Sequence, residues 1–261
     1  MLPDFEMIIH KFPERQDITI IPIADVHLGA RECMEQEFIG FIDRVKDELT
    51  TYFVLCGDLI SNGLKNSVTN IYEELYRPFE QKKMMAKILE PIRDRILCVT
   101  NGNHERRSGK DSDDSPVYDI CAKLDIEHLY RDNMCFVKLQ FGQCDGDGKT
   151  NPTYTMVVTH GAGGGALTGG GVNRSERMGY AVDNMDIFIS GHTHRPLVTQ
   201  PGKIYIDTRN NKVSIKPFKV VTATSWLVPG GYSLQKMLTP TSHAMQTIIL
   251  RGNRKEMVVT M

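Results

Sequence analysis

Short apolar runs separated by polar turns mark the first half of the chain. Three of these runs have the length and composition of buried strands: residues 18–24, 52–56 and 96–100. Residues 38–49 carry apolar side chains at helical spacing, and residues 67–95 form a longer helical stretch that we expect to break near Pro78 and Pro91. Strands that alternate with helices predict a sheet core covered by helices.

The second half of the chain is mostly strand by the same criteria. Expected strands and β-rich runs cover residues 134–141, 153–159, 186–190, 203–207, 213–215, 220–224, 247–250 and 257–260. Turn residues 145–148 are expected to join the first two of these strands. We predict an exposed polar loop over 106–115 and short helices over 116–123 and from about residue 173.

The chain shows no internal repeat and no linker-like tract of low complexity. We therefore predict one α/β (α+β) domain over residues 1–261. In this domain the segment from about residue 203 to residue 261 is β-rich, and the mixed sheet core has helices on its outside.

Composition excludes some classes of protein and leaves others open. The apolar fraction of 41 % and the charged fraction of 24 % are ordinary for a soluble globular protein, and a net charge of −1 provides no global basic field for nucleic acid or membrane. The six cysteines include no CxxC pair, so we interpret them as reduced thiols. Without a signal peptide or an apolar run near the roughly 20 residues that span a bilayer, we predict a cytoplasmic protein with no membrane contact. The sequence does not indicate its oligomeric state.

Residue types that bind metals follow the ends of five of the predicted strands. They are Asp25 and His27, Asp58, Asn103 and His104, His160, and His192 and His194. In open α/β sheets, ligands bind in the crevice outside the carboxyl ends of strands, so these residues are expected to converge. Carboxylate, imidazole and amide oxygen suit Mn, Fe, Zn or Ni, and the absence of thiolate argues against a purely structural zinc site. Each motif taken alone also has an ordinary structural explanation, such as a turn or a buried core histidine. The whole set, in this order and at strand ends, predicts a metal site.

These motifs resemble those of the calcineurin-like metallophosphoesterase superfamily, which run D-x-H, G-D, G-N-H-[D/E], H and G-H-x-H. The matching segments are Asp25-Val26-His27, Gly57-Asp58, Gly102-Asn103-His104-Glu105, His160 and Gly191-His192-Thr193-His194. The resemblance covers residues 20 to about 195. It implies a four-layer αββα sandwich, in which two mixed β-sheets pack face to face between helices. It also implies two divalent metal ions, which we expect to be Mn, with Fe, Zn or Ni as alternatives.

The resemblance further implies a role for each residue. One metal would be held by Asp25, His27 and His194, and the other by Asn103, His160 and His192. Asp58 would bridge the two ions, while His104 would lie over the substrate phosphate without binding metal. Two ions about 3.5–4 Å apart can lower the pKa of a shared water, whose hydroxide would attack phosphorus in line. His104 could then donate a hydrogen bond or a proton to the leaving oxygen, and Glu105 would orient His104 or a backbone group.

Three further segments allow more than one interpretation. Arg106 and Arg107 could contact substrate phosphates or could be solvated surface charges. The glycine-rich residues 161–171 lack the Gly-Lys-Ser/Thr of a P-loop, so we expect a mobile loop beside the site and not a nucleotide cradle. Residues 226–232 either form an aromatic wall beside the site or belong to the core.

We expect a phosphodiesterase or nuclease that acts on a phosphate ester, with nucleic acid or a nucleotide as the candidate substrate. A phosphomonoesterase, such as a protein phosphatase, is the alternative because the acidic residue of the third motif is Glu105. The protein phosphatase pattern G-D-x-x-D-R-G is absent, however, since Ser61 and Asn62 stand at its last Asp and Arg. A non-catalytic binding module is the third hypothesis, and the complete motif set counts against it.

Overall fold

In the part of the chain that the computed structural model describes, the β-structure consists of two six-stranded mixed sheets and one separate two-stranded hairpin. The structure describes residues 3–65, 67, 71–142, 151–163, 168–230, 240 and 242–261. Sheet 1 has the order β14-β13-β2-β3-β4-β5 and sheet 2 the order β1-β6-β7-β8-β12-β9, while β10 and β11 pair only with each other in the described chain.

The strands have the following bounds: β1 Ile8–Phe12, β2 Ile18–Ile23, β3 Thr51–Leu55, β4 Ile96–Thr100, β5 Tyr130–Arg131, β6 Met134–Phe141, β7 Thr153–Thr159, β8 Ile187–Ser190, β9 Leu197–Thr199, β10 Gly202–Asp207, β11 Lys212–Pro217, β12 Lys219–Thr222, β13 Thr247–Leu250 and β14 Met257–Thr260. The α-helices are α1 Glu35–Val45, α2 Pro78–Leu89, α3 Arg106–Ser112, α4 Pro116–Lys123 and α5 Thr168–Ala181. Short 3₁₀ turns cover Pro3–Phe5, Ile71–Glu73, Glu90–Arg95 and Glu127–Leu129.

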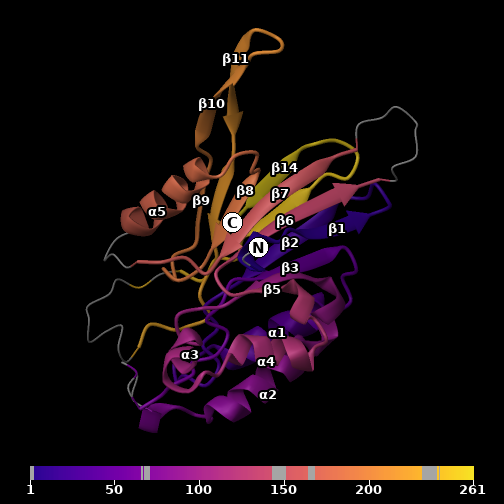
Figure 1. The fold of residues 1–261 in the computed structure, drawn as a ribbon. Coiled ribbons are helices and arrows are strands. Elements are labelled where there is room, and N and C mark those ends of the chain that lie inside the picture. Colours follow the sequence, from indigo (N-terminus) through magenta and orange to yellow (C-terminus); the bar gives the residue numbers. More distant parts are fainter. Residues whose placement is uncertain are drawn as a thin grey trace.

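The two sheets pack against each other, with helices on their outer sides. Strand β4 of sheet 1 contacts β6 and β7 of sheet 2, and α5 contacts β8 and β12. Helices α1, α2 and α4 gather on the outer side of sheet 1 (Figure 1). Central strands β3 and β4 are covered on both faces, which explains why they consist of continuous apolar runs. This arrangement confirms the predicted fold class of two mixed sheets with helices outside.

Parallel strands order the loops that carry the motifs. In sheet 1, β2, β3, β4 and β5 run parallel, so the chain leaves β2, β3 and β4 at the same edge. In sheet 2, β7, β8 and β12 run parallel and provide a second set of ends. The predicted strands 18–24, 52–56 and 96–100 are all confirmed, with bounds that shift by one residue at most.

Two expectations about helices need correction, and a third is confirmed. The predicted loop at 106–115 is wrong over most of its length, because α3 covers Arg106–Ser112 and ends at Asp113 in the left-handed conformation. Helix α5 begins at Thr168, about five residues before the predicted start, although glycine is a poor helix former. The long helical stretch does break at its prolines, since α2 begins at Pro78 and a 3₁₀ turn covers Glu90–Arg95.

Some sequence expectations can be tested only in part. The five cysteines in the described residues are free thiols, whereas Cys144 and the predicted turn at 145–148 lie outside those residues. Trp226 is a core residue, because it is almost fully buried and packs against Phe38 and Phe41 with ring centroids 4.9 and 5.4 Å away. Among the helices that the structure describes, none is both long and apolar enough to cross a bilayer.

Candidate functional site

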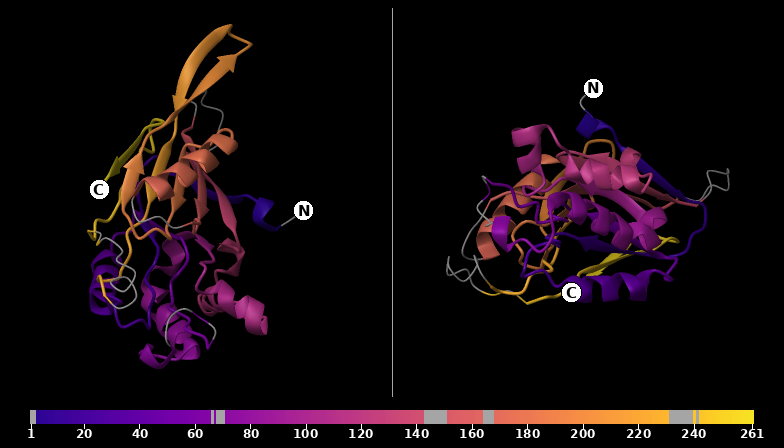
Figure 2. Two further views of the ribbon diagram at one scale, coloured as in Figure 1. Left: turned by 90° about the vertical axis from the view of Figure 1, so that its left-hand side faces the viewer. Right: turned by 90° about the horizontal axis from the view of Figure 1, so that it is seen from below.

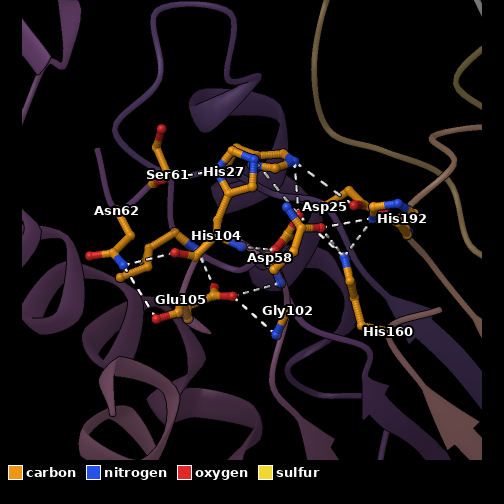
Figure 3. A network of polar contacts seen from close by, with 12 residues as sticks. Asp25, His27, Asp58, Ser61, Asn62, Gly102, His104, Glu105, His160 and His192 are labelled. Atoms are coloured by element: carbon orange, nitrogen blue, oxygen red, sulfur yellow. Dashed lines mark hydrogen bonds and ion pairs between the residues drawn. The ribbon is translucent and has the colours of Figure 1, made fainter. Parts of the chain in front are cut away.

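The five strand ends that carry metal-binding residue types meet at one place between the two sheets. The loops after β2, β3 and β4 come from sheet 1, and those after β7 and β8 come from sheet 2. Side chains from these loops point toward a common centre near Asp58 (Figure 3). The residues brought together are Asp25, His27, Asp58, Asn103, His104, His160, His192 and His194.

One cluster in this region consists of Asp25, His27 and His194, whose ligand atoms all lie within 4.8 Å of one another. The Nε2 atom of His194 lies 3.2 Å from Asp25 Oδ1 and 3.3 Å from His27 Nε2. The distance from His27 Nε2 to Asp25 Oδ1 is 3.8 Å. Two imidazole nitrogens and a carboxylate oxygen therefore face the same small volume.

A second cluster surrounds the Nε2 atom of His160. It lies 2.9 Å from Asn103 Oδ1, 3.1 Å from His192 Nδ1 and 3.3 Å from Asp58 Oδ2. The amide oxygen of Asn103 also lies 2.8 Å from His192 Nδ1. Four ligand-type atoms from both sheets thus converge here.

Asp58 lies between the two clusters. Its Oδ2 atom is 3.3 Å from His160 Nε2 and 3.8 Å from His27 Nε2, so one carboxylate oxygen reaches both groups. Its Oδ1 atom accepts a hydrogen bond of 2.8 Å from the backbone N–H of His104, which fixes the carboxylate between them.

The donor atoms present suit a cation. The Nδ1 atom of His160 lies 2.7 Å from the carbonyl oxygen of Cys56, which can only accept, so Nδ1 carries a hydrogen and Nε2 is the nitrogen left for a proton or a metal ion. That nitrogen faces the oxygens of Asn103 and Asp58. The Oδ1 atom of Asp25 is buried and accepts no hydrogen bond from any described residue. Buried nitrogen and oxygen acceptors that face one another need a proton or a cation between them, and a metal ion bound by nitrogen and oxygen can take that place. These residues therefore fit a metal-binding site.

The electrostatics of the site also favour positive charge. Burial lowers the pKa of His160, but the Asp58 carboxylate outweighs it and raises the pKa to about 9. Burial, reinforced by the neighbouring His104, holds the pKa of His27 well below its ordinary value. Two buried carboxylates, Asp25 and Asp58, thus create a negative potential that only a proton or a cation can balance.

Two motif glycines allow the loops to approach one another closely. A Cβ atom on Gly102 would lie 2.1 Å from Asp58 Oδ1, and one on Gly191 would lie 2.8 Å from Asp25 Oδ2. Neither distance is possible between real atoms, so any other residue would displace the carboxylates.

Five residues of the site have a backbone in the left-handed region, which non-glycine residues rarely adopt. They are Asp25 (φ 51°), His27 (φ 50°), Asp58 (φ 51°), His192 (φ 69°) and His194 (φ 56°). Such conformations persist only where the surrounding structure holds them. Here they bend each strand end so that residues two apart, such as Asp25 and His27, face one volume.

Glu105 binds backbone groups and not the ring of His104. Its buried carboxylate accepts hydrogen bonds from the N–H groups of Asp58, Ile60 and Gly102 at 3.1, 3.0 and 3.2 Å. Of the two roles predicted for this residue, orienting a backbone group agrees with these contacts.

His104 approaches the site from one side. Its Nδ1 atom donates to the carbonyl oxygen of Ser61 at 2.9 Å, and its Nε2 atom lies 3.9 Å from Asp58 Oδ2. The ring stands edge-on to that of His27, with centroids 4.3 Å apart. His27, Asp58 and His104 also form a group of possible ligands, although the ring of His104 is less buried than that of His27.

The two arginines that follow Glu105 differ in their surroundings. Arg106 Nη2 donates to the carbonyl oxygen of Asp132 at 2.6 Å, so its guanidinium is held by the turn before β6. Arg107 Nη1 is buried without a hydrogen-bond partner in the described part of the chain. Burial lowers the pKa of Arg107, while the charges of Asp58 and Glu105 oppose this effect. Of the two arginines, Arg107 is therefore the one that interacts electrostatically with the carboxylates of the site.

Sequence reasoning missed two supports of the site. The carbonyl oxygen of Asp25 accepts hydrogen bonds from Trp226 N at 3.0 Å and Ser225 Oγ at 3.1 Å, in a segment far along the chain. Asn62 is fully buried and donates to the carbonyl oxygen of His104 at 2.9 Å. No motif marks the first support, and the second was visible only as a departure from the protein phosphatase pattern.

The chain is similar to a known protein family and to a solved structure. A family model described as calcineurin-like phosphoesterase matches residues 18–196. Among solved structures, NAD nucleotidase from Haemophilus influenzae is similar with a TM-score of 0.44 and 10 % identity. The similarity covers 94 % of this chain and 49 % of that one, so the chain spans about half the length of the nucleotidase. No curated protein matches the sequence.

Proposed function

The chain belongs to the calcineurin-like phosphoesterase family and is a phosphoester hydrolase, and from this premise we propose that it hydrolyses phosphodiesters at a centre of two divalent metal ions. Nucleic acid or a nucleotide is the proposed substrate class, and manganese is the proposed metal. The cytoplasmic location inferred from the sequence stays a prediction.

The observation that carries this proposal is the position of Asp58. Its Oδ2 atom lies within 4 Å of both His27 Nε2 and His160 Nε2, which belong to different clusters. We assign Asp25, His27 and His194 to one ion, Asn103, His160 and His192 to the other, and Asp58 to both. This is the ligand set that the family resemblance of the motifs implied.

The residues of the chain then have distinct roles. When bound, two divalent ions would supply an activated water and neutralise charge on the phosphate oxygens. Because Nδ1 of His104 donates to the carbonyl oxygen of Ser61, the protonated ring would present its second N–H at Nε2, where it can hydrogen-bond to the leaving oxygen or protonate it. Arg107 would supply a further positive charge to the phosphate, whereas Arg106 is occupied by Asp132.

The residues that replace the protein phosphatase pattern support a diester substrate. A phosphate monoester dianion is best held by arginine clamps. In this chain Asn62 stands at the position of the arginine, and its amide is buried against the carbonyl oxygen of His104, where it cannot reach a substrate. A diester carries one negative charge fewer and needs less of this compensation.

The proposal is tested by metal analysis together with two assays. The protein would be loaded with Mn²⁺, dialysed and assayed with bis-p-nitrophenyl phosphate and p-nitrophenyl phosphate. We expect hydrolysis of both, with kcat/KM higher for the diester, and loss of both activities on chelation. A preference for the monoester would support the phosphatase alternative. Metal-loaded protein that hydrolyses neither ester would overturn catalysis and support a binding module.

A further inference from the structure

Two consecutive residues, Ser61 and Asn62, hold His104 from two sides. The carbonyl oxygen of Ser61 accepts a hydrogen bond of 2.9 Å from Nδ1 of the His104 ring. The side-chain amide of Asn62 donates a hydrogen bond of 2.9 Å to the carbonyl oxygen of His104. The ring and the backbone of one histidine are therefore both fixed by the same short segment (Figure 3).

The orientation of the Asn62 amide follows from its neighbours. Its nitrogen lies 2.9 Å from the carbonyl oxygen of His104 and 3.5 Å from that of Glu105. Carbonyl oxygens can only accept, so the atom that faces them must be the NH₂ group. The same nitrogen lies 2.9 Å from Ser108 Oγ. The side chain is fully buried, and its donors are directed at the segment that carries His104.

A closed ring of hydrogen bonds anchors residues 61 and 62 to α2. The backbone N–H of Asn62 donates to Gln81 Oε1 at 2.8 Å, and Gln81 Nε2 donates to Glu74 Oε2 at 2.9 Å. Ser61 Oγ donates to Glu74 Oε1 at 2.7 Å and closes the ring. Gln81 is fully buried, and Asn62 has a left-handed φ of 47°, so this anchor is rigid.

We propose that Asn62 is a positioning residue for His104, which it holds in the geometry that delivers a proton to the leaving oxygen. This inference rests on the proposed function, in which His104 is the proton donor. The contacts of the Asn62 amide nitrogen are to the carbonyl oxygens of His104 and Glu105 and to Ser108 Oγ, none of which belongs to a proposed metal ligand, so it acts through the backbone of His104. Its effect should therefore depend on how much the leaving group needs a proton.

The test compares two diesters that differ only in the leaving group, methyl p-nitrophenyl phosphate and methyl phenyl phosphate. p-Nitrophenolate leaves without a proton, whereas phenolate, a stronger base, benefits from one. We expect Asn62→Asp to lower kcat for the phenyl ester at least about tenfold more than for the p-nitrophenyl ester, with KM unchanged. Asp keeps the shape and tolerates the left-handed backbone, but presents an oxygen to the carbonyl of His104.

Four further variants make the test decisive. His104→Ala should show the same selectivity for the leaving group, and the double variant should lose no more than His104→Ala alone, because Asn62 acts through that ring. Asn62→Gly, which accepts the left-handed φ of 47° without strain, should repeat the result if Asn62→Asp folds poorly. Asn211→Asp is the matched control, since Asn211 also has a left-handed φ of 50° but lies in the hairpin beyond sheet 2, and it should change neither rate.

The possible results separate the inference from the proposed function. One result is that His104→Ala slows the phenyl ester more than the p-nitrophenyl ester, while both Asn62 variants, with full metal content, slow the two esters equally. In that case Asn62 has a structural role only and the inference is wrong. If His104→Ala itself slows both esters equally, the role proposed for His104 is wrong and the inference fails with it. Selectivity in all three single variants supports both.

Discussion

The two ends of sheet 2 contrast in how the chain leaves the strands. At the carboxyl ends of β7 and β8, loops turn into a buried site and are braced by the loops of sheet 1. At the opposite end, β10 and β11 continue outward as a hairpin (Figure 2). The hairpin leads directly into β12, whose first residue, Lys219, pairs with Ile187, the first residue of the parallel strand β8. The hairpin therefore lies at the amino end of β8, whereas the site lies at its carboxyl end.

The hairpin is apolar on one face and yet exposed. Ile204 pairs with Ile215, and Ile206 pairs with Val213, and all four side chains are between 67 and 77 % exposed. On the other face, the Lys216 ammonium lies 3.1 Å from the centre of the Tyr205 ring. Alternating apolar residues formed a strand pair here without a facing layer in the described chain.

An apolar strand followed by a polar turn is therefore not sufficient to make a site. At the metal-binding end, each loop is held by groups from another loop, such as Glu105 on Asp58 N–H and Asp25 Oδ2 on His192 N–H at 2.8 Å. The hairpin has no comparable support from distant segments among the hydrogen bonds of its described residues, apart from Lys203 at its base. We therefore expect the two ends to respond very differently to substitution.

The largest effect is expected for Asp58→Asn. The substitution keeps the shape but removes the charge that lies between His27 and His160, which are 3.8 and 3.3 Å from Asp58 Oδ2. We expect kcat/KM for bis-p-nitrophenyl phosphate to fall by roughly 10³-fold or more, with reduced metal content. Activity equal to that of the parent at equal Mn²⁺ would refute the role of this carboxylate.

A large effect is also expected for Gly102→Ala. The added Cβ would lie 2.1 Å from Asp58 Oδ1, so the carboxylate must shift and the rate should fall by roughly 10²-fold. The matched control is Gly169→Ala in α5, where a Cβ meets nothing within 4 Å. That control should retain activity and gain about 0.5–1 kcal/mol of stability in urea unfolding. Equal losses in both variants would show that glycine at position 102 has no special role.

A smaller effect distinguishes the two arginines near the site. Arg107→Ala should raise KM for the diester about tenfold, because its Nη1 has no hydrogen-bond partner among the described residues and is available to the phosphate. Arg106→Ala is the control, since its guanidinium is bonded to Asp132, and KM should stay within about twofold of the parent. The reverse order of KM values would contradict the assignment.

The smallest effect is expected at the hairpin. Replacing Ile204 with Ser should leave kcat/KM unchanged and alter the free energy of unfolding by no more than about 0.5 kcal/mol, because the side chain is 77 % exposed. Denaturant unfolding and the diester assay would measure both quantities. A marked loss of activity would show that the hairpin affects the site, and the two ends of sheet 2 would then not differ in their response to substitution.

The sequence predicted most of the strands and the residues that converge, because buried strands are continuous apolar runs and their ends carry side chains of unusual type. It did not predict the supports of the site. The contact of Ser225 with Asp25 joins residues 200 positions apart, and no local pattern encodes such a contact. Helix α3 was missed because Arg106–Ser112 is polar throughout, and its first turn is set by Gly102, whose carbonyl oxygen accepts from Arg106 N at 3.2 Å.

The most direct test of the central claim is an anomalous difference map from crystals grown with Mn²⁺. We expect two peaks between the sheets, one against Asp25, His27 and His194 and one against Asn103, His160 and His192, with Asp58 in contact with both. A map with no peak at these residues, or with a single ion that Asp58 does not touch, would contradict that claim.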